Sequence, residues 1–256
     1  MTVTRGKYAG VLNILQYNTR YYIASACAML GISELLWLRL LPTAGEVILI
    51  GAAIITAFWS LSSLLTSYYI YDHVGVTRWK WLPAMLSFRP RQWLNIHAGL
   101  DESTAILAQF FPNTAYMVVD VYDSREMTEP SIARARLVHP SPQPAVPGKL
   151  DALPLPDRDR DTLFLLFTAH EIRHPAGRVE FFLEVARVLA NSGQVILVEH
   201  LRDWKNFVAF GPGFLHFYSR NEWLRVAGEA GLTVEREERV TPFVRCFLLH
   251  KTATRN

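Results

Sequence analysis

The sequence predicts an α/β domain with a doubly wound, mostly parallel sheet, preceded by a transmembrane helical hairpin. Two observations carry this prediction. Two long apolar runs lie within the first 71 residues, and from residue 92 onward short apolar runs alternate with helical stretches. A chain of 256 residues is long enough for one sizeable α/β domain and one further element.

The hairpin is predicted from residues 21–41 and 47–67, each of which is apolar over about the length that crosses a bilayer core. Pro42 and Gly45 mark a turn between them, and the second run carries no charged residue. A cleaved signal peptide does not fit, because the runs are too long and the second follows at once. The alternatives are a pair of buried soluble helices and a dimerisation element that would make a homo-oligomer.

Basic residues flank the pair of runs, and the turn between them carries none: Arg5, Lys7, Arg20, Arg78, Lys80, Arg89 and Arg91. The positive-inside rule therefore predicts that both termini and the domain lie on the cytoplasmic side of the inner membrane. Tyrosines at the two cytoplasmic ends of the hairpin fit an aromatic belt, which makes membrane lipid an expected partner. The one deep acid, Glu34, is either functional or close to the outer interface.

These patterns divide the chain into four predicted parts. Residues 1–20 form a cytoplasmic segment, 21–71 the hairpin, 72–91 an interfacial linker, and 92–256 the α/β domain. In the linker, Trp79 and Trp81 alternate with Arg78 and Lys80, a mixture that suits lipid headgroups. An ordinary linker with a basic surface is the alternative.

Within the domain, apolar runs predict strands at 93–97, 116–121, 162–167, 194–199, 232–238 and 243–250, and helices at 101–111, 129–137, 177–190 and 219–230. The net charge of +3 gives no case for nucleic acid as a partner. Cys27 and Cys246 are too few and too far apart for a disulfide framework or a zinc cluster.

The second half of the domain resembles the class I S-adenosylmethionine-dependent methyltransferases of the UbiE-like kind. The resemblance lies in LDALPLPDRDRDTLFLLFTAHEI, FFLEVARVLANSGQVILVEH and SRNEWLRVAGEAGLTV, and the similar region spans about residues 92–250. It implies a Rossmann-like, seven-stranded sheet with a closing antiparallel pair. It also implies S-adenosylmethionine as the cofactor.

The glycine loop of that family departs from its usual form in this chain. The stretch NIHAGLDEST stands where the family has an acid followed by three alternating glycines. The acid falls on Asn95, and the glycines fall on His97, Gly99 and Asp101, so only Gly99 is kept. The resemblance nevertheless implies that these four residues bind the cofactor, with the loop rebuilt rather than lost.

Further cofactor-binding residues are implied at the ends of later strands. Asp120 matches the acid that binds the ribose hydroxyls, with capping of the next turn as its alternative role. Asp151 lies near the position that accepts from the adenine amino group. Phe167 and Thr168 follow the strand at 162–167 and would line the cofactor and the substrate.

Histidines and acids follow several strands and are expected to meet at one edge of the parallel sheet. The candidates for catalysis are His170, Glu171, His200 and His216, with His170 or His200 as the base that removes the acceptor proton. A divalent metal is a second interpretation, with His97, His170, His200 and His216 as candidate ligands. Ordinary hydrogen-bonded structural roles are the third.

Three functional hypotheses follow. The first is a membrane-anchored S-adenosylmethionine-dependent methyltransferase that acts on a lipophilic small molecule, such as a quinone, phenol, polyene or lipid. The second is a repurposed enzyme on the same fold, with a histidine and glutamate metal or acid–base site. The third is a non-catalytic membrane protein used for binding or assembly. Hydrolysis through a nucleophilic serine is not expected, because the chain has no G-x-S-x-G elbow.

Overall fold

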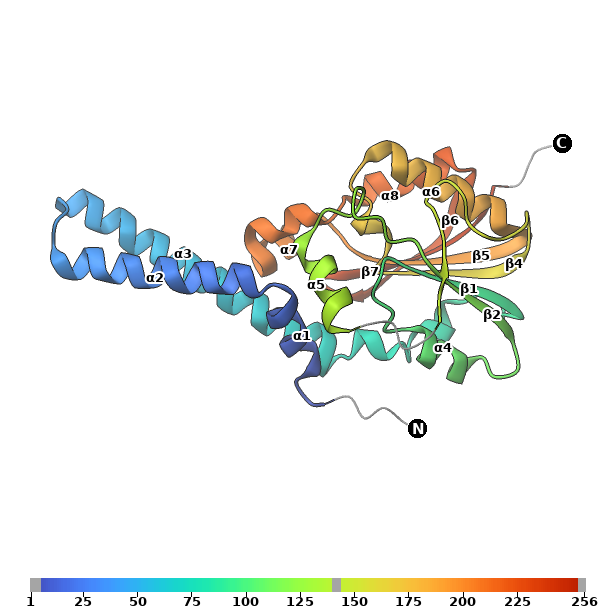
Figure 1. Ribbon diagram of the computed structural model, residues 1–256, viewed down its shortest axis with the longest axis horizontal. Coiled ribbons are helices and arrows are strands. Elements are labelled where there is room, and N and C mark those ends of the chain that lie inside the picture. Colours follow the sequence, from blue (N-terminus) through green and yellow to red (C-terminus); the bar gives the residue numbers. More distant parts are fainter. Residues whose placement is uncertain (1–5, 140–143, 253–256) are drawn as a thin grey trace. The chain divides into compact units, whose positions relative to one another are not determined.

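The computed structural model describes residues 6–139 and 144–252, which form two compact units. One unit comprises Met1–Val74 together with Trp204–Phe214, and the other comprises Gly75–Asp203 and Leu215–Asn256. The second unit is the α/β domain. Its sheet has seven strands in the order β3-β2-β1-β4-β5-β7-β6 (Figure 1).

Strands β1 to β5 pair in parallel, and β7 runs antiparallel to both of its neighbours, β5 and β6. The strands are β1 Gln92–His97, β2 Ala115–Asp120, β3 Val146–Pro147, β4 Arg160–Leu166, β5 Leu189–His200, β6 Leu232–Thr241 and β7 Val244–Lys251. The helices of the domain are α4 Thr104–Phe110, α5 Pro130–Val138, α6 Pro175–Val188 and α8 Arg220–Glu229. The predicted doubly wound fold with its closing antiparallel pair is confirmed.

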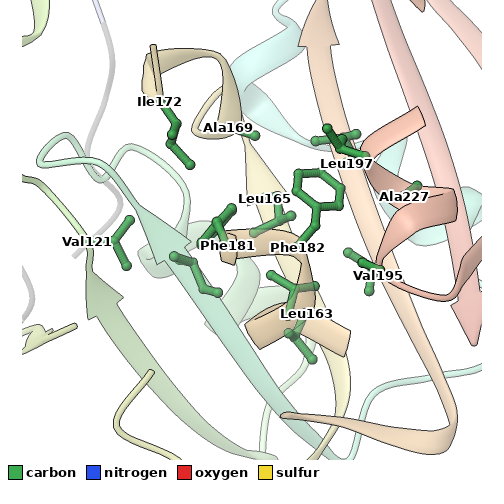
Figure 2. Packing of buried hydrophobic residues seen from close by; sticks show 14 of the residues in the cluster. Val121, Leu163, Leu165, Ala169, Ile172, Phe181, Phe182, Val195, Leu197 and Ala227 are labelled. Atoms are coloured by element: carbon green, nitrogen blue, oxygen red, sulfur yellow. The ribbon is translucent and has the colours of Figure 1, made fainter. Parts of the chain in front are cut away.

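The core of the domain lies between the sheet and the helices α6 and α8, which cover one face while α4 lies on the other (Figure 1). Alternate residues of the central strands face opposite ways, so Leu163 and Leu165 meet the helices while Phe164 packs against Trp93 on the other face. Figure 2 shows Phe181 and Phe182 of α6 reaching down to β4 and β5. These rings hold α6 against the central strands of the sheet.

The first unit contains the predicted hairpin. Helix α2 spans Thr19–Leu38 and helix α3 spans Thr43–Ser67, joined by a turn in which Arg39 is left-handed. Tyr22 Oη lies 3.1 Å from Ser63 Oγ, which pairs the start of α2 with the end of α3. Both helices are long and apolar enough to cross a membrane, and neither apolar stretch is buried by the described parts of this chain. They are therefore not core helices of this fold.

Several elements were not expected from the sequence. A short helix α1, Ala9–Tyr17, precedes the hairpin, and a π-helical segment, Tyr68–His73, follows α3. The carboxylate of Asp72 ties the two together by accepting the backbone N–H groups of Gly10 and Val11 at 2.7 and 2.9 Å. Strand β3 has only two residues, and α7 spans Trp204–Phe210, where no helix is predicted from the sequence. Arg5, which was counted for the orientation, lies outside the described residues.

The linker predicted at 72–91 is divided by the structure, because Gly75 onward belongs to the α/β unit. Trp79 is 1% exposed and packs against Phe167 at the end of β4, with ring centroids 5.8 Å apart. An interfacial role for Trp79 was therefore wrong, since a tryptophan buried in the domain cannot reach headgroups. The α/β domain therefore begins before β1 and includes the segment from Gly75 onward.

We expect the domain's stability to depend strongly on Phe182 and little on its neighbour Leu183. Phe182 is fully buried against Trp223, whereas Leu183 is 48% exposed. Phe182→Ala should lower the free energy of unfolding by about 3–5 kcal/mol, because it leaves a cavity in the core. Leu183→Ala should stay within about 0.5 kcal/mol. Denaturant unfolding of the detergent-purified protein measures both, and equal losses would contradict this packing.

Candidate functional site

The strand order reverses between β1 and β4, and in open α/β sheets ligands bind at the carboxyl ends of the strands at such a point. Two groups of polar side chains lie at the carboxyl ends of these and the adjacent strands. We call the first the loop cluster, formed by Asn95, His97, Gly99, Asp101, Asp120 and Arg136. We call the second the acid–histidine cluster, formed by Glu129, His170, Glu171, Arg173, Glu199 and His216.

The rebuilt glycine loop is held by side chains where the usual motif has bare backbone. Asn95 Nδ2 donates to Ser103 Oγ at 2.9 Å and to Thr104 Oγ1 at 2.7 Å. Asp101 Oδ1 accepts the backbone N–H groups of Ser103 and Thr104 at 3.0 and 2.9 Å, so it caps the start of α4. The second polar atom of each side chain has no such role. Asn95 Oδ1 and Asp101 Oδ2 are buried and have no hydrogen-bond partner among the described residues.

His97 closes the same loop from the end of β1. Its Nδ1 accepts the backbone N–H of Gly99 at 3.0 Å and lies 3.7 Å from Asp120 Oδ1, while its buried Nε2 has no partner in the described chain. Burial lowers the pKa of His97 and outweighs the opposing pull of Asp120 and Asp101. His97 is thus a neutral ring that accepts within the loop, and the structure does not bring it to the other histidines of the predicted metal set.

Asp120 stands at the end of β2, as predicted, and both its oxygens are engaged. Oδ1 accepts the backbone N–H of Tyr122 at 3.0 Å, which is the capping role, and Oδ2 binds Arg136 Nη1 at 2.7 Å. The Arg136 guanidinium also lies over the Tyr122 ring, 4.2 Å from its centroid. Gly99 has a φ of +91°, and a Cβ there would collide with the Arg136 side chain. Arg136 therefore fills the space between Gly99 and Asp120.

The acid–histidine cluster is organised by a buried pair. Glu199, at the end of β5 and 0% exposed, binds His170 Nδ1 at 2.5 Å and accepts the backbone N–H groups of Ala169 and His170. Burial opposes protonation of His170, but the carboxylates of Glu199 and Glu171 outweigh it and raise its pKa to about 10. The bond at Nδ1 leaves Nε2 facing Glu171, whose Oε1 is 3.4 Å away.

Glu171 lies between two histidines. His216 Nε2 is 3.7 Å from Glu171 Oε1, and burial of Glu171 is outweighed by its hydrogen bonds to His170 and His216, which hold its pKa well below the usual range. Burial disfavours protonated His216, but Glu129 and Glu171 raise its pKa. One ligand atom each from His170, Glu171 and His216 lies within 4.8 Å of the others, a spacing that could hold a metal ion. Glu171 Oε2 is buried with no partner among the described residues.

Other predicted site residues are placed outside these two clusters. His200 stacks on Phe167 and Phe217 and its Nδ1 lies 3.0 Å from Phe243 O, so the structure does not bring it to the group of three possible ligands. Phe167 has a φ of +55°, and Thr168 bonds Ile96 O at 3.0 Å, joining the ends of β4 and β1. Asp151 is exposed in a turn between the bridged residues Lys149 and Ala152.

Three members of the clusters were missed by sequence reasoning. Arg136 and Glu129 belong to the region of α5, which carries no motif, and nothing in the local sequence marks them. Arg173 belongs to the cluster because its Nη1 donates to His216 O at 2.7 Å and to His170 O at 3.2 Å. The signal available for Arg173 was its position three residues after His170, inside the loop that follows β4.

Comparison with known proteins shows the fold. No family model matches the chain, and no curated protein matches it. Among solved structures, the mitomycin 7-O-methyltransferase MmcR aligns over 97% of this chain and 74% of its own, with 13% identity and a TM-score of 0.57. The PH0226 protein from Pyrococcus horikoshii OT3 aligns over 72% and 96%, with 16% identity and a TM-score of 0.51. The pyocyanin biosynthetic protein PhzM aligns over 76% and 62%, also with 16% identity and a TM-score of 0.51. The chain thus has the class I methyltransferase fold.

The charge of Glu199 should appear in the pH dependence of stability. The folded pKa of His170, about 10, lies above its ordinary value of 6.5, so protonated His170 stabilises the fold fully below pH 6.5. That contribution is lost as the pH rises towards 10. In Glu199→Gln the free energy of unfolding should therefore fall less steeply over this range than in the wild type. Glu180→Gln, which changes an exposed carboxylate of α6, is the control. Equal slopes in denaturant titrations would refute the assigned coupling.

Proposed function

We propose that this protein is a membrane-anchored, S-adenosylmethionine-dependent methyltransferase that acts on a lipophilic small molecule with a hydroxyl group. The observation that carries the proposal is the buried His170–Glu199 pair on a methyltransferase fold, at the sheet edge where such folds bind ligands. A histidine oriented by a buried carboxylate is a standard arrangement for general base catalysis.

The loop cluster fits the cofactor in its polar atoms. Asn95 Oδ1 and Asp101 Oδ2 are unused buried acceptors, which suits the ammonium group at the methionine end of S-adenosylmethionine. Asp120 is the acid that would hold the ribose hydroxyls. His97 Nε2, which carries the ring proton because Nδ1 accepts the Gly99 N–H, is an unused buried donor in the same loop. Arg136 does not fit as it lies, because its side chain occupies the space beside Gly99 and Asp120 where a ribose would lie, so cofactor binding requires it to move.

The proposed chemistry assigns each catalytic task to a side chain. When bound, S-adenosylmethionine supplies an electrophilic methyl group on a positively charged sulfur. Glu171 Oε1, 3.4 Å from His170 Nε2, would stabilise the ring once that nitrogen carries a proton. Neutral His170 would take the hydroxyl proton on Nε2 as the methyl group passes from the cofactor sulfur to the hydroxyl oxygen, with S-adenosylhomocysteine as the leaving group. Glu199 would hold the resulting imidazolium. His216 keeps Glu171 in place from the other side.

Membrane anchoring is proposed from the two candidate spans. An anchored domain would meet acceptors that partition into the bilayer, such as quinones, phenols, polyenes or lipids. The neighbour MmcR is named a mitomycin 7-O-methyltransferase, which supports an oxygen atom of a small molecule as the methyl acceptor. The proposal places the domain on the cytoplasmic side of an inner membrane and includes association of copies through the hairpin. It also assigns Asp151 as a contact to the adenine of the cofactor.

A second candidate function is a metal-dependent reaction at the acid–histidine cluster. The spacing of His170, Glu171 and His216 favours it, as does the bond from His170 Nδ1 to Glu199, since metal-binding histidines commonly use their second nitrogen in this way. In this alternative Nε2 of His170 binds a divalent ion and cannot act as the base. The two candidates therefore predict opposite responses to chelators.

We expect Arg136→Ala to bind S-adenosylhomocysteine more tightly than the wild type. The substitution removes the side chain that fills the ribose position, so one ion pair need not be broken on binding. The gain should be about fivefold to tenfold, the equivalent of roughly 1 kcal/mol for a half-exposed pair. Calorimetric titration in detergent measures it. Arg134→Ala, an exposed arginine of the same helix, is the control. Weaker binding by Arg136→Ala alone would contradict the obstruction.

The rate of methyl transfer to a lipophilic phenol should rise with pH, because His170 must lose its proton before it can act as the base. The midpoint of kcat/KM should lie well above neutral pH in the wild type and move down in Glu199→Gln, which removes a charge that raises the pKa of His170. His170→Asn should lower kcat by about 100-fold or more. Activity that is unaffected by EDTA fits this mechanism. Loss with EDTA and recovery with zinc or manganese would replace it by the metal-dependent candidate.

A further inference from the structure

The segment that follows β5 packs against the predicted membrane hairpin, although it is far from the hairpin in sequence. Trp204–Phe214 belongs to the same compact unit as α3. The Phe207 ring meets Trp59 edge-on, with ring centroids 5.5 Å apart. Gly211 has a φ of +55°, and a Cβ there would meet the Trp59 ring at 2.6 Å. Only glycine permits this close approach.

A side chain of α3 donates a hydrogen bond to a backbone carbonyl of α7 that has no partner within its own helix. The carbonyl of Val208 would ordinarily accept the N–H of the residue four positions later, but that residue is Pro212, which has no N–H. Ser62 Oγ of α3 donates to Val208 O at 3.2 Å instead. Such compensation matters most outside water, where an unsatisfied carbonyl costs several kcal/mol.

The exposed face of α7 is apolar. Trp204, Phe207 and Val208 follow helical spacing and are 71%, 39% and 46% exposed, whereas Asn206 and Ala209 on the other side are buried. A short helix in water has the opposite pattern. The surface of α3 is similarly apolar and exposed, at Ile54, Phe58, Leu61 and Leu65. Lys205 Nζ lies 5.7 Å from the Trp204 ring, a pairing suited to the headgroup boundary.

The depth of the contact follows from its position on α3. Trp59 and Ser62 lie six to nine residues before Tyr68, which begins the tyrosine-rich end of the hairpin. At 1.5 Å per residue the contact lies roughly 9–14 Å inside that end of the helix. A segment packed there lies beside the acyl chains if α3 spans a bilayer, rather than above the headgroups.

We infer that Trp204–Phe214 is a third membrane element, which inserts the Trp204–Phe207–Val208 face into the hydrocarbon of the bilayer beside α3. This rests on the proposed membrane anchoring. The element connects directly to the proposed site, since Asp203 follows β5 by three residues and Phe214 precedes His216 by two. The partner is the lipid itself, because the exposed face continues the apolar surface of α3.

Site-directed spin labelling of the full chain in phosphatidylcholine nanodiscs tests this inference. In a Cys27→Ser background, the label is placed in turn through Val208→Cys, Leu61→Cys on α3, and Leu183→Cys on the exposed surface of α6. Cys246 is buried and stays in place. At position 208 we expect the spin label to collide more often with oxygen than with a water-soluble nickel chelate, which indicates a lipid environment. We expect the same result at position 61 and the opposite result at position 183.

Each other outcome overturns the inference in a distinguishable way. If the label at position 208 collides mainly with the nickel chelate, as at position 183, while the label at position 61 is in lipid, then α7 lies outside the membrane although the hairpin spans it. Water exposure at both 61 and 208 shows that the anchoring itself fails. Spin–spin broadening at 208 between two copies shows that a second copy of the chain covers this face instead of lipid.

The packing on α3 has its own control. Gly211→Ala should shift the label at 208 towards the water-soluble chelate, because the added Cβ cannot coexist with Trp59. Gly213→Ala should leave it unchanged, because a Cβ there meets only Phe210 Cβ, at 3.9 Å. Equal responses of the two variants would show that contact with Trp59 does not hold the element in lipid.

Discussion

The buried carboxylate of Glu199 must be satisfied, because an isolated charge inside a domain costs far more than folding can supply. It is satisfied by the loop after β4, through the N–H groups of Ala169 and His170 and the ring of His170. One side chain at the end of β5 thereby determines the path of the neighbouring loop and the orientation of a histidine. The other ring nitrogen of that histidine, Nε2, lies 3.4 Å from Glu171 Oε1, and the same oxygen lies 3.7 Å from His216 Nε2.

The fold could be predicted because its signals are local. Continuous apolar runs such as 162–167 marked buried parallel strands, and the hairpin helices follow from length and composition alone. Strand β3 was missed because two residues carry no periodicity, and α7 because its apolar face points outward. Trp79 was misplaced because basic neighbours suggested headgroups, whereas its own side chain packs on Phe167.

The site was predictable in part. The convergence of His170, Glu171 and His216 followed from the rule that parallel strands end at one edge, and those three residues do meet. That rule does not say which way a ring turns, so it did not separate His97 and His200 from them. The partners Arg136 and Glu129 come from α5, whose place over the sheet edge depends on tertiary packing that no local pattern records.

The loop cluster shows how a motif can change while its site stays polar. Asn95 Nδ2 and Asp101 Oδ1 form hydrogen bonds that hold the loop. Asn95 Oδ1 and Asp101 Oδ2 are buried and have no hydrogen-bond partner among the described residues. Glycines in the usual motif leave the same space to the ligand by having no side chain. The account therefore requires that these atoms, together with Asp120, have a ligand to bind.

Calorimetric titration of S-adenosylmethionine into the purified full-length protein, beside its Asp120→Asn variant, tests that requirement most directly. The account predicts saturable binding by the wild type and binding at least about tenfold weaker by the variant, the equivalent of roughly 1.4 kcal/mol for a lost charged hydrogen bond. No binding by either protein at millimolar ligand would contradict it, and the fold would then serve a different chemistry.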